Sequence, residues 1–155
     1  DLIGRKWMQK KGTLFASILA EIDEFLAKNK GKLKGLDQEM AHLEKALGAY
    51  RQIQMTIGKY VQSGKIGLMA TYARRILTAT AQTYCGYLLL DQAKIALARM
   101  EELGPDHYDY NYYLGKVFSA RYYLNNAVPN VWHILELIQI GDTSVMEAPV
   151  DIFEY

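Results

Sequence analysis

Apolar residues recur at helical intervals along almost the whole chain, and this periodicity constrains the fold more than any other feature. Between residues 36 and 61 they step alternately by four and three residues, broken only at Gln54, where the neighbouring Ile53 can take the core position. The positions of this seam are Leu36, Met40, Leu43, Leu47, Tyr50, Gln54, Ile57 and Val61. The pattern predicts a long helix that packs against its neighbours at shallow angles, and no segment shows the alternation typical of a strand.

The same spacing predicts a first helix before this seam. Its stripe ends at the loop KNKGKLKG, in which Gly31 and Gly35 favour the end of one helix and the start of the next. The apolar residues of this stripe are Leu14, Phe15, Ile18, Leu19, Ile22, Phe25 and Leu26.

A third and a fourth helix follow the break at SGKIG. The third is predicted from Leu68 to about Leu103, where Gly104 and Pro105 predict a stop. Small residues dominate between Thr78 and Gly86, which allows another helix to approach closely. The fourth, over residues 110–128, has Asp109 as its candidate N-cap, ends before Pro129 and carries Tyr113, Val117, Ala120 and Leu124 on one stripe.

The C-terminal part predicts shorter helices. Residues 130–140 form one, closed by Gly141, and Ser144-x-x-Glu147 reads as a capping box that opens a final turn. Short connections make sequential helices pair antiparallel. We therefore expect an all-α fold, an up-down-up-down four-helix bundle with short extra C-terminal helices, forming a single domain over residues 1–155.

Composition excludes several classes of protein. The one cysteine, Cys85, cannot form an internal disulfide; its apolar surroundings predict a buried, inert thiol, and the chain is expected in the cytoplasm. The net charge is +1, and the clustered Lys28, Lys30, Lys32 and Lys34 lack interleaved aromatic residues, so a solvated loop is favoured over nucleic-acid binding. The weakly polar run 76–90 is too short for a membrane span.

The sequence contains no self-contained active site. Di-iron bundles need two Glu-x-x-His pairs, and this chain has one, Glu39 and His42, because neither His107 nor His133 has a carboxylate three residues before it. We predict no metal, catalytic or cofactor-binding residue in the chain. The many tyrosines around the fourth helix are better explained as packing rings than as a ligand site.

His42 supports one alternative function. Histidine phosphotransfer bundles carry an exposed helical histidine followed three residues later by Lys and then by Gly. Here His42 is followed by Lys45, but Ala46 comes next and Gly48 is two positions late. A phosphotransfer or adaptor bundle acting through His42 requires a free imidazole edge on an accessible helix face.

Several segments resemble a known family. DLIGRK is similar to the segment that follows the Y-E-G-T run, which bears the catalytic carboxylate, in bacterial acyl-CoA dehydrogenases with a C-terminal extension. LLLDQAKIAL, GKVFSARYYLNNAVPNV and IQIGDTSVMEAPVDIF resemble the last helices of that extension. The likeness covers nearly the whole chain, most specifically residues 1–7, 84–97 and 114–153.

This resemblance implies that the chain is the C-terminal accessory domain of an FAD enzyme that oxidises an acyl-CoA to its 2,3-enoyl-CoA. The catalytic glutamate and most of the flavin and thioester pockets would then precede Asp1, and residues 1–12 would be a connector helix. The chain would be non-catalytic alone and would hold no cofactor. Its partners would be the rest of its own polypeptide and further copies in a homo-oligomer, while the parent enzyme would use electron-transfer flavoprotein.

The apolar content exceeds what the predicted stripes need. We therefore expect an exposed apolar patch near the first helix, with Trp7 and Met8 turned toward the catalytic portion, and self-association of the isolated chain. The small residues of the third helix and the tyrosines Tyr110, Tyr112, Tyr122 and Tyr123 carry this expectation.

Overall fold

The computed structural model describes residues 1–153, and these residues form helices and turns with no strand. The helices are α1 (Thr13–Asn29), α2 (Asp37–Gln62), α3 (Ile66–Thr71), α4 (Ala73–Leu103), α5 (Tyr110–Asn126), α6 (Asn130–Ile140) and α7 (Ser144–Glu147). Three further helical turns are η1 (Leu2–Lys6), η2 (Gln9–Gly12) and η3 (Val150–Phe153). The predicted all-α class is confirmed.

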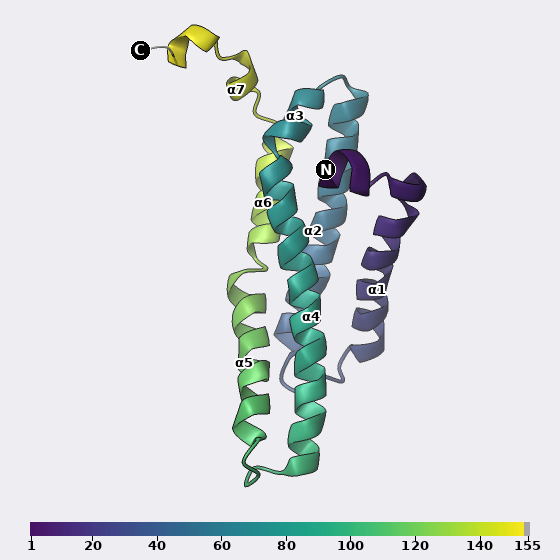
Figure 1. Ribbon diagram of the computed structural model, residues 1–155, viewed down its shortest axis with the longest axis vertical. Coiled ribbons are helices and arrows are strands. Elements are labelled where there is room, and N and C mark those ends of the chain that lie inside the picture. Colours follow the sequence, from purple (N-terminus) through teal and green to yellow (C-terminus); the bar gives the residue numbers. More distant parts are fainter. Residues whose placement is uncertain (154–155) are drawn as a thin grey trace.

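Consecutive long helices run in alternating directions, which is compatible with the expected up-down-up-down bundle (Figure 1). α5 and α6 follow one another along α4 and together occupy the position of the fourth helix, with the break at Pro129 between them. α1 lies on the outer side of the bundle next to α2, and α7 extends away from the far end of α6 (Figure 1).

The third predicted helix is divided at Tyr72. α3 ends one residue before it and α4 begins one residue after it, while the backbone N–H of Tyr72 still bonds to Leu68 and that of Ile76 bonds to Tyr72. The expected connector helix over residues 1–12 is also interrupted, because Lys10 and Lys11 have φ values of 49° and 57° in the left-handed region. Residues 1–12 therefore form two separate turns, η1 and η2.

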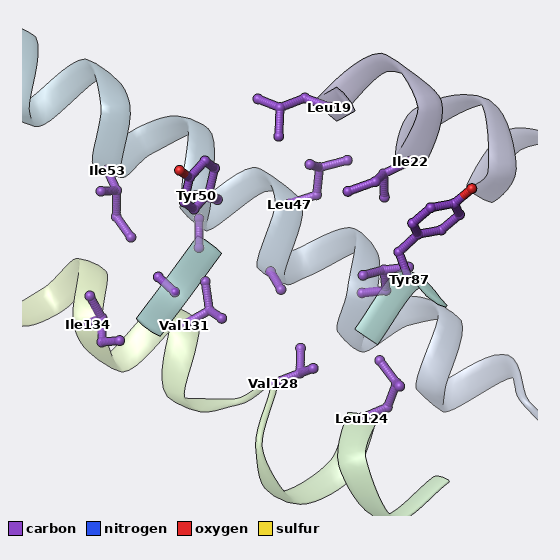
Figure 2. Close-up of a cluster of buried hydrophobic side chains, with 14 of the residues drawn as sticks. Leu19, Ile22, Leu47, Tyr50, Ile53, Tyr87, Leu124, Val128, Val131 and Ile134 are labelled. Atoms are coloured by element: carbon purple, nitrogen blue, oxygen red, sulfur yellow. The ribbon is translucent and has the colours of Figure 1, made fainter. Parts of the chain in front are cut away.

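The core lies where the α2 seam meets α4, α5 and α6 (Figure 2). As predicted, Ile53 replaces Gln54 inside, whereas Val61 at the end of the seam is exposed. Gly86 of α4 packs closely against the end of α5 and the residues after it, since a Cβ there would lie 3.0 Å from Val128 and 3.4 Å from Leu124. The small residues of α4 therefore allow close helix packing, as expected.

Glycines end the helices where predicted. Gly104 follows α4 with φ 77°, and Gly141 follows α6 with φ 66°. The capping box at Ser144 is wrong in detail, because Ser144 is the first residue of α7 and not its N-cap. Asp142 instead accepts hydrogen bonds from the backbone N–H and the hydroxyl of Ser144, and these bonds lower the pKa of its carboxyl group.

Candidate docking surface

His42 and Glu39 contact neighbouring helices. The His42 Nδ1 lies 3.1 Å from the carbonyl oxygen of Leu124, and its ring packs near that of Trp132 at 5.7 Å between centroids. Glu39 is 5% exposed and accepts a hydrogen bond from Asn125. His42 thus connects α2 to α5 and α6, and Glu39 connects α2 to α5. Among residues 1–153, no three His, Cys, Asp or Glu side chains are grouped to hold a metal ion.

The imidazole of His42 is held against the bundle on its Nδ1 side and is only partly accessible. One ring nitrogen contacts a main-chain carbonyl, the ring is half-buried, and the Lys45 ammonium lies 4.2 Å from the centroid of the Trp132 ring beside it. The other two histidines lie on different elements: the Nδ1 of His107 accepts the N–H of Asp109, and His133 lies 3.6 Å from Glu136. The structure does not bring the three histidines together.

The prediction of a buried Cys85 is wrong, because this side chain is exposed. The close packing of Gly86 and Tyr87 sets the rotation of α4, and Cys85, one position earlier, is turned outward. The pKa of the neighbouring Tyr123 is raised mainly by burial. The charge of Cys85 and its hydrogen bond with Tyr123 raise this pKa further.

An apolar groove lies between α1 and α4, and we call it the open groove. It encloses about 220 Å³ and is lined by Phe15, Ile18, Leu19, Ile22, Tyr50, Leu77, Thr80, Ala81, Thr83 and Tyr84. Three of the four hydroxyl groups in its lining are already bonded, since the Thr80 and Tyr50 hydroxyls are 2.7 Å apart and Thr83 donates to the carbonyl of Ala79. The groove therefore offers hydrocarbon and few free hydrogen-bonding groups.

The wall of the open groove formed by α4 continues as a line of large apolar side chains, which we call the open face. Leu77, Tyr84, Leu88 and Ile95 follow at intervals of 7, 4 and 7 residues, so they lie on one side of the helix. All four are exposed, Leu77 by 56%. A surface helix normally presents polar residues on this side, so a continuous apolar line here indicates a contact surface.

Polar and aromatic contacts hold α1 beside this groove without closing it. Tyr87 donates to Glu21 at 2.8 Å and packs edge-on against Phe25 at 5.2 Å, and Arg51 of α2 binds Asp23 through both guanidinium nitrogens. The hydrogen bond to Glu21, together with burial, raises the pKa of Tyr87 to about 12.

The N-terminal segment contributes to the same end of the molecule. Trp7 is not turned outward as expected: its indole N–H donates to the Tyr50 hydroxyl at 3.0 Å and its ring packs near Phe15. Met8 is exposed, as expected. A second groove, of about 670 Å³, lies between residues 1–6 and α3–α4 and shares Leu77 with the open groove.

Together, the fold and this surface define an all-α module whose most distinctive surface is apolar. The model of the family "Acetyl-CoA dehydrogenase C-terminal like" matches residues 18–149. Two butyryl-CoA dehydrogenases of Syntrophomonas wolfei are similar, one 38% identical over 149 residues and the other 36% identical over 153 residues. They cover 96% and 99% of the chain.

The chain belongs to this family and is a C-terminal acyl-CoA dehydrogenase-like domain. It spans about a quarter of the length of each relative, 24% and 25%. The resemblance seen in the sequence is thereby confirmed.

A groove of about 840 Å³ between α1 and α2 has a lining that does not fit a flavin dinucleotide. Three carboxylates, Asp23, Asp37 and Glu44, line it. Of its two cations, Lys30 and Arg51, the second is already paired with Asp23. A diphosphate needs free N–H donors or cations, so an acidic groove of this kind disfavours it.

None of the helices among residues 1–153 is both long and apolar enough to cross a membrane.

Proposed function

We propose that the chain is a helical accessory domain of a longer FAD-dependent acyl-CoA dehydrogenase, and that it docks through the open groove onto the catalytic part of the same polypeptide. The open face of α4 carries this proposal. Its line of Leu77, Tyr84 and Leu88 is exposed although leucine and tyrosine favour burial, and the adjoining N-terminal segment lies at the same end.

The remaining functions follow from the family. The parent enzyme oxidises an acyl-CoA to a 2,3-enoyl-CoA in the cytoplasm, holds FAD in its catalytic part and passes electrons to electron-transfer flavoprotein. The domain itself is non-catalytic and supports the contacts of a homo-oligomer. The match to butyryl-CoA dehydrogenases over nearly the whole chain supports this assignment, and the acidic lining of the groove between α1 and α2 agrees with a flavin site elsewhere.

The test uses the coding sequence that precedes Asp1. We expect it to encode a Y-E-G-T-like run and a flavin-containing protein. When this preceding part and residues 1–155 are expressed separately and mixed, calorimetric titration should detect a complex. Leu77→Glu and Ile18→Glu should each weaken the complex at least about tenfold, because each places a charge in the apolar contact.

Phe118→Glu, on exposed α5, is the matched control and should leave this binding unchanged. Absence of a Y-E-G-T-like run, or binding that is insensitive to both groove variants, would contradict the proposal.

The phosphotransfer alternative is not supported, because His42 Nδ1 contacts the Leu124 carbonyl and the ring packs near Trp132.

A further inference from the structure

The segment that follows α6 lies against α3 through the thioether of Met146. A Cβ placed on Gly67 of α3 would overlap the sulfur of Met146 and would lie 3.6 Å from both its Cγ and its Cε. The sulfur therefore occupies a seat on the α3 backbone that is open only because residue 67 has no side chain. α7, which carries Met146, lies beside the end of the bundle that α3 occupies (Figure 1).

Hydrogen bonds anchor this segment only at its start. The Tyr60 hydroxyl donates to the Ile138 carbonyl at 2.7 Å, and the backbone N–H of Asp142 donates to the Tyr72 hydroxyl at 3.1 Å. Among the described residues after Asp142, the hydrogen bonds remain within residues 142–153. Packing therefore attaches α7 to α3.

Met146 supplies most of this packing. Its side chain is 43% exposed, against 71% for Val145, 73% for Val150 and 51% for Ile152. These three neighbours present most of their hydrocarbon to water and bury little apolar area. Partial exposure also leaves the Met146 side chain accessible to a small oxidant.

We propose that Met146 is an oxidation site, and that its conversion to the sulfoxide releases the C-terminal segment from α3. In this step a peroxide transfers one oxygen atom to the sulfur: the O–O bond breaks, an S=O bond forms, the sulfur loses two electrons and the reduced peroxide leaves as water or an alcohol. The inference concerns a modification and does not depend on the proposed function.

The geometry of the seat explains why oxidation would release the segment. No further atom fits between the sulfur and the backbone of Gly67, so an oxygen on that side would force the side chain out. An oxygen on the outer side would make the group strongly polar and better solvated when detached. In either case the contact that holds α7 becomes weaker.

Other methionines of the chain provide an internal comparison. Met8 is 68% and Met55 is 59% exposed, so both side chains already lie mostly in water and their oxidation changes little packing. Met69 and Met100 are partly buried against the core, in helices that other buried residues hold in place. Met146 combines partial exposure with a contact that attaches a whole segment.

The experiment treats residues 1–155 with hydrogen peroxide in a Cys85→Ala background, which removes the exposed thiol. Peptide mass spectrometry follows the oxidation of each methionine, and hydrogen–deuterium exchange follows backbone opening. Exchange of residues 143–153 should rise at least about tenfold in step with oxidation of Met146, because exchange follows the population of the open segment. Reduction of the sulfoxide by a methionine sulfoxide reductase and a dithiol should restore the slow exchange.

Two pairs of variants separate this release from general oxidative damage. Met8→Leu/Met55→Leu removes the two most exposed methionines and should leave the response unchanged. Gly67→Ala fills the seat and should speed exchange of the segment without any oxidant. Gly58→Ala should not, because no atom lies within 4 Å of its Cβ position.

Four outcomes would overturn the inference. They are fast exchange of residues 144–148 before treatment, unchanged exchange after complete oxidation of Met146, a response that disappears in Met8→Leu/Met55→Leu, and a Gly67→Ala chain whose segment exchanges as slowly as in the unsubstituted chain.

Discussion

The two sides of α4 differ in the size of their side chains, and the larger apolar side chains lie on the exposed side. The side facing α2, α5 and α6 is buried and consists largely of small residues, with Ala79, Thr83 and Gly86 at its centre. The open face carries the larger side chains Leu77, Tyr84 and Leu88 and is exposed. Small residues bring helix axes close and bury backbone and neighbouring side chains, whereas large exposed apolar residues are typical of a contact surface.

The largest effect on the free energy of unfolding is expected from the matched variants Leu90→Ala and Leu88→Ala. Leu90 is fully buried and Leu88 is 40% exposed on the same helix. Truncating Leu90 should lower the free energy of unfolding by about 3 kcal/mol, because transfer and cavity terms add, and truncating Leu88 should cost under about 1 kcal/mol. Urea unfolding of the chain measures both. Equal costs would show that the open face is already covered in solution.

This contrast also explains what the sequence could predict. The α2 seam is apolar on one side, so its periodicity identified the buried residues, including Ile53 in place of Gln54. α4 is apolar on both sides, with Leu77 and Ile95 exposed and Leu90 buried, so periodicity alone does not identify its buried side. Which side faces the core is decided by the close approach of Gly86 to Val128, a contact between residues distant in sequence.

The candidate surface was predictable only in part. Excess apolar content predicted an exposed patch near the first helix, and the open groove beside α1 lies there. Its residues were not identified, because Trp7 was expected to turn outward and instead donates to Tyr50. An indole N–H paired with a phenol 43 positions away leaves no local signal in the sequence.

The second test measures stability at alkaline pH, where Tyr50, which lines the open groove, loses its proton. Burial raises the pKa of Tyr50 to about 12, although its hydrogen bonds with Thr80 and Trp7 act in the opposite direction. The unfolded chain releases this proton near pH 10 and the folded chain retains it, so rising pH favours unfolding. The stabilisation is complete below pH 10 and should be lost between about pH 10 and 12, on the order of 2 kcal/mol from Tyr50 alone.

Tyr50→Phe is the control for this titration. It should cost about 1 kcal/mol at pH 7 through the lost hydrogen bonds, and it should make the fall in stability above pH 10 shallower. A smaller slope should remain, because Tyr87 also has a pKa raised to about 12. Denaturant midpoints at successive pH values give the slope, and an unchanged slope in the variant would mean that the Tyr50 hydroxyl is accessible to water at the groove floor.

The smallest expected effect comes from adding one methyl group at Gly86, on the buried side of α4. Alanine in place of a helical glycine ordinarily stabilises by about 0.5–1 kcal/mol, since the unfolded chain loses freedom. At Gly86 the added Cβ would lie 3.0 Å from Val128 and 3.6 Å from Leu43, so overpacking should outweigh this gain and leave a net loss of about 1 kcal/mol. Gly58→Ala on α2 is the matched control, because no atom lies within 4 Å of its Cβ position, and it should stabilise. The midpoint temperature of thermal unfolding should fall for Gly86→Ala and rise for Gly58→Ala. A rise for both variants would mean that α4 can move away from α5 and α6 to accommodate the methyl group. The two sides of α4 would then differ less in packing than the buried side chains indicate.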